Sequence, residues 1–251
     1  MVSWAITGAT RGIGSVDPKN QVFALIRSRG TAGPLEKLAA KRKNIHIVVT
    51  DISDPRKLDQ ATAEVSKVTA GSLDVLILNA GSAGPDTNAL PPIKIDCSQI
   101  KNNLISNIYV IHSFLDLVRN GKEKKIIFIS SQSGDVEVTR ISGLPTMLGY
   151  SISKAGMNMV TTKFGIELAQ DGIKTLSMSP GWVNTDAAQA VTGDPEIRKF
   201  MLSAFHKIDP SVNGPIPVDE SVTAMLQVIQ NLTEANSGKF LTHHGNDDEW
   251  F

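Results

Sequence analysis

Residues 3–14 read SWAITGATRGIG, a short apolar run followed at once by a glycine-rich turn. The run is typical of a buried β-strand, and the glycines after it let the backbone bend tightly and approach a ligand closely. Backbone amides at the start of a following helix would face an anion such as a pyrophosphate. The stretch therefore predicts an anion-binding turn formed by Gly8, Thr10, Arg11, Gly12, Ile13 and Gly14. Such turns also occur without a ligand, so the other motifs must decide.

Short β-rich runs alternate with helical patterns along the chain. Strands are expected near residues 3–7, 21–26, 45–50, 75–79, 125–130, 174–179 and 239–241. Helices are expected near residues 35–43, 56–70, 98–120, 151–170 and 220–232. This alternation indicates a doubly wound α/β fold with a mostly parallel sheet, in which ligands bind beyond the carboxyl ends of the strands. We expect a single domain over residues 1–251, with residues 182–217 as a mobile flap over the site.

The composition excludes several classes of protein. Lys+Arg and Asp+Glu both number 25, so no general electrostatic attraction to nucleic acid or to an anionic membrane is expected. Cys97 is the only cysteine, which excludes a disulfide framework and a cysteine-based zinc site. His243 and His244 are expected to point in different directions without a carboxylate at ligand spacing, so no metal is expected. No signal peptide or membrane-spanning run is apparent, and a cytoplasmic protein is expected.

Tyr150 and Lys154 are four residues apart at the start of a helical pattern, so both side chains lie on one face. A tyrosine has an ordinary pKa of about 10, and a neighbouring ammonium would lower that pKa enough to make Tyr150 a catalytic acid or base. The alternative is an aromatic residue beside a solvated lysine, which a pattern this short would favour on its own. Ser131, after a predicted strand, could hydrogen-bond a substrate oxygen, although Ser130 and Ser133 compete with it and such serines often only form turns.

These motifs together resemble the short-chain dehydrogenase/reductase family. The turn has the spacing TGxxxGxG, and it is followed in the family's order by Asn79-Ala80-Gly81, Ser131, Tyr150 with Lys154, and Pro180-Gly181. The motifs span nearly the whole chain, and the tail from Ser237 to Asn246 is similar to that of fungal NADP-dependent carbonyl reductases. The resemblance implies a Rossmann-like fold and a hydride transfer between a nicotinamide and a ketone, aldehyde or alcohol.

The resemblance also implies roles for single residues. It makes Tyr150 the proton donor and a cofactor contact, Lys154 its partner and a ligand of the nicotinamide ribose, and Ser131 the catalytic serine. Asn103 would be the fourth catalytic residue, in a water-linked proton relay to the lysine, with Asn102 and Asn107 as alternatives. The remaining cofactor contacts would come from Asp51, Asn79, Ala80, Gly81, Pro180, Gly181, Val183 and Thr185. Asp51 could equally cap the following helix, and Ser131 is farther from Tyr150 than is usual in the family, which predicts a bulged loop at 138–145.

The choice between NAD and NADP depends on the end of the second strand. An acidic residue there would bind the ribose hydroxyls of NAD, whereas arginines accept the additional phosphate of NADP. Residues 22–35 contain no Asp or Glu but include Arg27 and Arg29, and Arg11 lies in the turn. The sequence therefore predicts NADP, although any one of these arginines could be merely exposed.

One segment departs from the family's pattern. Only residues 15–20 separate Gly14 from the second predicted strand, and Pro18 lies among them. A multi-turn helix does not fit there, which would weaken both pyrophosphate binding and the apolar cover of the sheet. This shortened crossover motivates a second hypothesis, a cofactor-binding regulator or weakened pseudoenzyme. A sugar-nucleotide epimerase is disfavoured because the TGxxGxxG spacing and an additional substrate domain are absent.

The resemblance also implies a homodimer or homotetramer.

Overall fold

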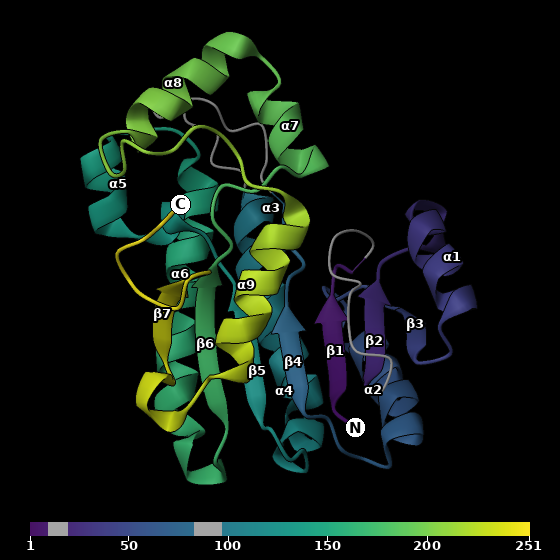
Figure 1. Cartoon of the computed structure of the whole chain (residues 1–251). Helices are drawn as coiled ribbons and strands as arrows, with labels where there is room; N and C mark the ends of the chain where they lie inside the picture. Colours follow the sequence, from purple (N-terminus) through teal and green to yellow (C-terminus); the bar gives the residue numbers. More distant parts are fainter. Residues whose placement is uncertain (10–19, 83–96) are drawn as a thin grey trace.

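The computed structural model describes residues 1–9, 20–82 and 97–251, which form one seven-stranded sheet (Figure 1). The strand order is β3-β2-β1-β4-β5-β6-β7, and every pair of neighbouring strands is parallel. The strands are β1 (Ser3–Thr7), β2 (Gln21–Ile26), β3 (Ile45–Val49), β4 (Val75–Leu78), β5 (Lys125–Ile129), β6 (Lys174–Ser179) and β7 (Lys239–Thr242). The predicted doubly wound fold is confirmed.

The strand order reverses between β1 and β4. The chain first builds outward from β1 to β3, and then returns to place β4 on the other side of β1, where Ile6 lies opposite Ile77. In sheets of this kind the crevice beyond the carboxyl ends of the two central strands is the place where a ligand binds. Gly8 and Asn79 follow these two strands directly.

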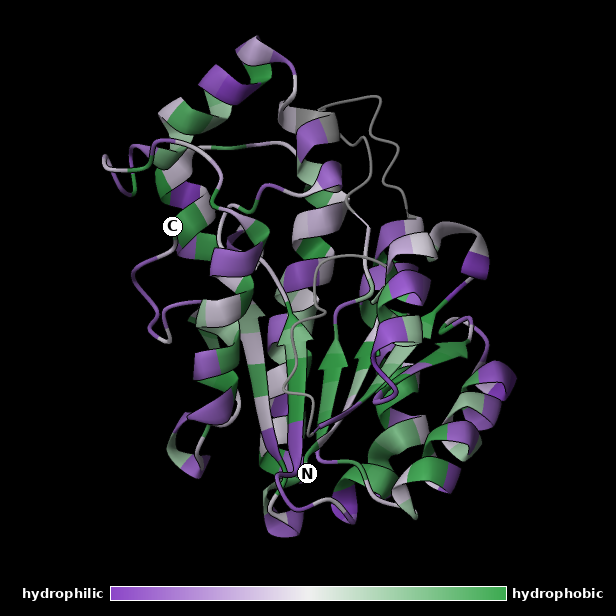
Figure 2. Ribbon diagram, turned by 45° about the vertical axis from the view of Figure 1, so that its right-hand side comes forward, coloured by the Kyte–Doolittle hydropathy of each residue, from purple (hydrophilic) through white to green (hydrophobic). Residues whose placement is uncertain are grey.

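Helices cover both faces of the sheet (Figure 1). One face packs against α2 (Pro55–Thr69), α4 (Ser106–Arg119) and α6 (Leu148–Glu167), and the other packs against α1 (Gly33–Lys41) and α9 (Val218–Gln230). Figure 2 shows the central strands mostly in the hydrophobic colour, with hydrophobic and hydrophilic residues mixed on the surrounding helices. Because successive strand residues point to opposite faces, β2 contributes Phe23 and Leu25 to one core and Val22 and Ala24 to the other.

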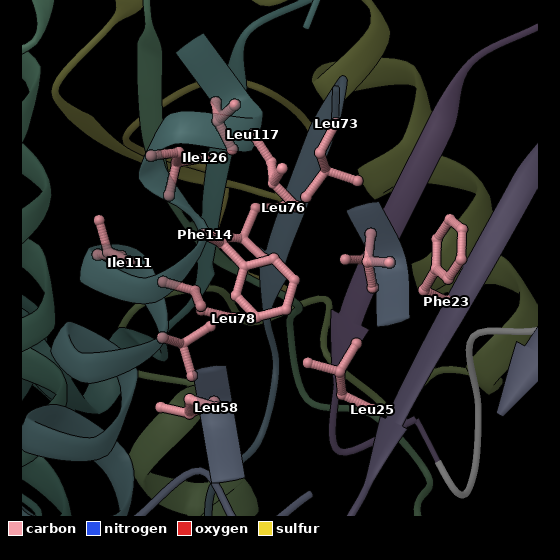
Figure 3. Close-up of a cluster of buried hydrophobic side chains, with 14 of the residues drawn as sticks. Phe23, Leu25, Leu58, Leu73, Leu76, Leu78, Ile111, Phe114, Leu117 and Ile126 are labelled. Atoms are coloured by element: carbon pink, nitrogen blue, oxygen red, sulfur yellow. The ribbon is translucent and has the colours of Figure 1, made fainter. Parts of the chain in front are cut away.

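One of the two cores lies under α2 and α4. Phe114 of α4 is fully buried there, together with Leu58 of α2 and Leu76 and Leu78 of β4 (Figure 3). Burying a side chain of this size stabilises the fold by about 1.5–3 kcal/mol. This core fixes α4 against the central strands and so sets the position of the segment that precedes it, α3 (Cys97–Ile100) and a π-helical turn at Lys101–Ile105.

The sequence placed the start of α6 too late and missed a helix in front of it. A bulged loop was expected at 138–145, but α5 (Val136–Ser142) occupies most of that segment. The side chain of Asp135 accepts a hydrogen bond from the backbone amide of Val138, and Gly143 ends the helix with φ +68°. These are ordinary capping signals. The helix α6 begins at Leu148 rather than at residue 151, so Tyr150 lies inside its first turn.

Residues 182–217 are more structured than a flap without strands would be. They contain α7 (Asp186–Thr192) and α8 (Pro195–Phe205), both of which lie beyond the carboxyl ends of the strands (Figure 1). Val183 and Ile216 form a parallel bridge that closes the segment at its base. The two helices were not predicted, because the prediction relied on hydrophobic periodicity. The side chains of Thr185 and Asp194 nevertheless cap them by accepting backbone hydrogen bonds. The mobility of the segment stays a prediction.

Several predicted features lie outside the described residues. Among them are the shortened crossover and the turn residues Thr10, Arg11, Gly12, Ile13 and Gly14. In the described ranges, no helix is long and apolar enough to cross a membrane.

Candidate active site

Tyr150 and Lys154 occupy the first two turns of α6, next to the carboxyl end of β5. They are one helical turn apart, and the Lys154 Nζ lies 5.4 Å from the centroid of the Tyr150 ring. The same amine donates a hydrogen bond of 2.7 Å to the backbone carbonyl of Ile129, the last residue of β5. The strand end therefore holds the lysine against the tyrosine, as the spacing of the two residues predicted.

Ser131 approaches Tyr150 from the turn that follows β5. Its hydroxyl hydrogen-bonds the Tyr150 side chain and also accepts a hydrogen bond of 3.1 Å from the backbone amide of Ser133. The competing Ser130 faces the other way, since its hydroxyl donates to Asn158 Oδ1 at 2.7 Å. Ser131 is thus the serine of this turn that the fold brings to Tyr150.

Burial raises the pKa of Tyr150 above its ordinary value of 10.0, and the hydrogen bond with Ser131 acts in the opposite direction. The expectation that Lys154 would lower this pKa is wrong for the protein by itself. Removing a phenolate from water costs more than the Ser131 hydroxyl returns, and Lys154 makes no resolved contribution. Tyr150 is therefore fully protonated at neutral pH and available as a proton donor.

Burial lowers the pKa of Lys154 to about 8. Lys154 is buried in α6, with only 5% of the residue exposed. An ammonium group is disfavoured where water is excluded. The amine is therefore poised to exchange a proton within the physiological range.

This shifted pKa predicts how stability depends on pH. The pKa of Lys154 is about 8 in the folded protein, whereas a lysine has an ordinary pKa of 10.5, so the unfolded chain binds more protons between these two values. Stability should therefore rise with pH in this window. Relative to Lys154→Met, the wild-type free energy of unfolding should increase by about 2 kcal/mol between pH 7 and pH 9.5. Urea unfolding of both proteins measures this, and a difference that stays constant with pH would contradict it.

Asn103 lies in the π-helical turn at Lys101–Ile105 and is fully buried. Its side chain binds both backbone groups of Ser82, accepting from the amide at 2.8 Å and donating to the carbonyl at 2.9 Å. It also donates to the Ser153 hydroxyl at 3.1 Å, and that hydroxyl donates to the backbone carbonyl of Tyr150. Asn103 therefore connects the end of β4 to the helix that carries Tyr150, and π-helical turns of this kind are frequent at functional sites.

The described part of the glycine turn contacts the segment after β4. Gly8 has φ +68°, and a Cβ atom on it would lie 2.8 Å from the Ala80 Cα. Asn79 donates from its side-chain amide to the carbonyls of Thr7 and Gly8 at 3.1 and 3.2 Å. The two strand ends thus meet backbone to backbone, a contact that only glycine at position 8 allows.

The end of β2 carries the arginines that the sequence assigned to NADP. Arg27 is exposed, whereas Arg29 forms an ion pair of 3.1 Å with Glu36 of α1. This acidic partner, Glu36, lies one residue beyond the stretch 22–35 that favoured NADP. Of the two, Arg27 is the better candidate for binding a phosphate.

Asp51 lies just after β3 and does not cap α2. Its carboxylate accepts hydrogen bonds from the Ser53 amide and hydroxyl at 3.0 and 2.8 Å. These bonds are the main reason why its pKa is lowered, and the charge of Arg27 adds to them. Asp54 is the residue that caps α2. The carboxylate therefore stays ionised beside Arg27, at the edge where an adenosine is expected.

Pro180 and Gly181 follow β6. The Pro180 carbonyl accepts a hydrogen bond of 2.7 Å from the Ser221 hydroxyl of α9. Gly181 has φ +82°, and a Cβ on it would lie 2.9 Å from Cε1 of His243. The ring centroids of His243 and His244 are only 3.9 Å apart. The expectation that the two side chains point in different directions is therefore wrong. Burial, and then the neighbouring His244, lower the pKa of His243 to about 4.

Val183 and Thr185 continue from this turn into α7. Val183 is half-buried at the bridge to Ile216, and the exposed Thr185 caps α7 by accepting from the Ala188 amide at 3.1 Å. Their contacts with a nicotinamide stay predictions. No group of three or more His, Cys, Asp or Glu side chains that could hold a metal ion is found in residues 1–9, 20–82 and 97–251.

Two polar residues that the sequence reasoning missed hold the Ser131 turn. Ser179, the last residue of β6, donates to Gln132 Oε1 at 2.7 Å and accepts from the Gln132 and Gly181 amides at 3.2 and 3.4 Å. Both side chains are buried. A serine at the buried end of an apolar strand was the available signal, because a buried hydroxyl needs a partner.

The similarities of this chain to known proteins agree with this geometry. A family model described as short chain dehydrogenase matches residues 4–196. The chain is 45% identical to the short-chain dehydrogenase/reductase atnB of Arthrinium sp, covering 100% of both sequences. It is 35% identical to the short-chain dehydrogenase/reductase AacuF of Aspergillus aculeatus, covering 98% of each.

Among solved structures, the fold matches the NADPH-bound carbonyl reductase from chicken fatty liver with a TM-score of 0.82. The two are 30% identical, and the match covers 97% of each chain. The carbonyl reductase Sniffer of D. melanogaster matches with a TM-score of 0.81 at 25% identity over 100% of both chains. Both the predicted resemblance and its fungal character are confirmed. The chain therefore belongs to the short-chain dehydrogenase/reductase family and is an oxidoreductase of that family.

Proposed function

We propose that the protein is an NADP-dependent reductase of ketones or aldehydes that can also oxidise the corresponding alcohols. The observation that carries this proposal is the convergence of Ser131 and Lys154 on Tyr150 at the carboxyl end of β5. A hydroxyl that is held by a second hydroxyl and flanked by a buried amine is suited to exchanging one proton with a substrate oxygen.

The described residues fit a bound NADP. The close approach of Gly8 to Ala80 leaves backbone, rather than side chains, at the switch point of the sheet. Arg27 offers an exposed guanidinium at the end of β2 for the additional phosphate. Lys154 would hold the nicotinamide ribose, while Asp51 and the Asn79–Gly81 segment would contact the adenosine. When bound, the cofactor supplies the hydride.

The chain's own residues would handle the proton. Tyr150 would donate the proton of its hydroxyl to the carbonyl oxygen as that oxygen gains negative charge, and Ser131 would hydrogen-bond the same oxygen. The raised pKa of Tyr150 keeps the donor protonated before the reaction. Lys154, whose pKa is about 8, would stabilise the resulting phenolate and help to restore its proton, with Asn103 on the route to solvent.

The direct test is a fluorescence titration of the purified protein with NADPH and with NADH, followed by NADPH consumption with a panel of ketones and aldehydes. We expect NADPH to bind at least about tenfold more tightly than NADH, since one phosphate–arginine contact is worth at least about 1.4 kcal/mol. A preference for NADH would contradict the role given to Arg27. Absence of NADPH binding would exclude an NADP-dependent reductase, and binding without turnover across the panel would favour the cofactor-binding regulator.

A further inference from the structure

A second buried asparagine lies one helical turn after Asn103. Asn107 is fully buried in the first turn of α4, and its side-chain amide donates to two backbone carbonyls. The carbonyl of Asn103 accepts at 2.7 Å and that of Ala80 accepts at 3.2 Å. A single side chain thus joins the π-helical turn to the segment after β4.

The geometry makes this bridge part of a clamp. Asn103 holds Ser82 by its amide and its carbonyl, while Asn107 holds Ala80 two residues earlier. Two amides at positions i and i+4 of neighbouring helical turns therefore grip the same short segment at both ends. Gly81 lies between the two grips.

The gripped segment forms a wall beside the lysine. A Cβ on Gly81 would lie 3.2 Å from Asn103 Oδ1 and 3.8 Å from Lys154 Nζ. The position of this wall therefore sets both the space around the amine and the separation between the amine and Asn103. A π-helical turn also loosens the regular i→i−4 hydrogen bonds of a helix. The Asn107 amide, which donates to the Asn103 carbonyl, therefore restrains a backbone group that the helix alone holds less firmly.

We propose that Asn107 is a positioning residue for the reaction, which fixes Asn103 and the wall at Ala80–Ser82 in register with Lys154. The inference rests on the proposed function, because it assigns Asn107 a role in the proton transfer that Lys154 and Tyr150 would perform. The Oδ1 atom of Asn107 is buried and has no hydrogen-bond partner among the described residues. An asparagine that only filled space at this position would cost more than an apolar residue of the same size.

Asn107→Leu removes both hydrogen bonds with little change in volume, and Asn107→Asp keeps the shape but replaces the donor. Ser106→Ala is the matched control, since the fully buried Ser106 hydroxyl donates to the Lys101 carbonyl within the same turn and holds no part of the wall. We expect Asn107→Leu to lower kcat by at least about tenfold, with the KM for the carbonyl within about threefold, because a small misplacement of the relay affects the chemical step. Ser106→Ala should retain kcat within about threefold.

Hydrogen exchange of the amides at 80–82 gives a readout that does not need activity. These amides should exchange at least about tenfold faster in Asn107→Leu than in wild type and in Ser106→Ala. If the wild type consumes no NADPH, the proposed function fails, while the exchange rates still test the clamp. A kcat no lower than that of Ser106→Ala, or unchanged exchange at 80–82, would overturn the proposal. If Asn107→Leu does not fold, Asn107→Asp carries the same two measurements.

Discussion

Tyr150→Phe is expected to lower NADPH-dependent carbonyl reduction by about 10²- to 10⁴-fold, the usual contribution of a positioned general acid. The substitution removes one oxygen atom and leaves the ring that packs beside Lys154. It also removes the hydrogen bond to Ser131, which should cost only about 1 kcal/mol of stability. The affinity for NADPH should change by less than about threefold, because Lys154 still provides the contact to the ribose.

The measurement is kcat/KM with the best substrate of the carbonyl panel, together with the Kd for NADPH from fluorescence. Tyr109→Phe is the matched control, since Tyr109 is the only other tyrosine of the chain and is 37% exposed on α4. The control should react at the wild-type rate. Turnover that survives Tyr150→Phe would show that another group donates the proton, and it would leave the fold and the family unaffected.

Gly134→Ala is the second substitution with a large expected effect. A Cβ on Gly134 would lie 2.7 Å from the Ala155 amide nitrogen and from the Lys154 carbonyl carbon, and 2.8 Å from the Lys154 Cβ. Two of these atoms are backbone of α6 and cannot move independently. The turn that carries Ser131 must therefore separate from the helix that carries Tyr150 and Lys154. A displacement of about 1 Å can lower a rate by about 10²-fold, and we expect a loss of kcat/KM of at least that size.

Gly156→Ala provides the comparison for this variant. A Cβ on Gly156 would approach the side chain of Leu104, with Cδ2 nearest at 2.6 Å, and the end of a leucine side chain can rotate away. Alanine also favours a helix by about 1 kcal/mol over glycine. Gly156→Ala should therefore retain most of its activity and thermal stability, while Gly134→Ala loses both. Wild-type kcat/KM in Gly134→Ala would show that Ser131 does not need its contact with α6.

Much of the fold could be predicted because its signals are local. Each strand is a short apolar run, and the alternation with helices is sufficient to indicate a parallel doubly wound sheet. The missed helices α5 and α7 are only seven residues long, too short for a clear hydrophobic pattern, and α8 lies in a stretch rich in Gly, Pro and Asn, which favoured a loop. Their capping residues Asp135, Thr185 and Asp194 were nevertheless visible in the sequence.

The meeting of Ser131, Tyr150 and Lys154 could be predicted from the sequence, but their electrostatics could not. The spacing of Tyr150 and Lys154 already placed them on one face. The sign of the Tyr150 pKa shift could not be read in this way, because it depends on how much water the completed fold removes. The same holds for Asn107, whose two carbonyl partners belong to segments that meet only after β4 and α4 have packed.

The small hydrophobic cluster around Trp182 has a consequence for which substitutions the chain tolerates. Trp182, Phe205 and Val212 form a hydrophobic cluster of their own, distinct from the two clusters that sandwich the sheet. Residues 182–217 thus carry their own source of cohesion, whereas Ser131, Tyr150 and Lys154 depend on the sheet and α6. Mutations in α7 and α8 can accumulate with little effect on the chemical apparatus. A loss of packing around Trp182 should therefore disturb residues 182–217 before it disturbs Ser131, Tyr150 and Lys154.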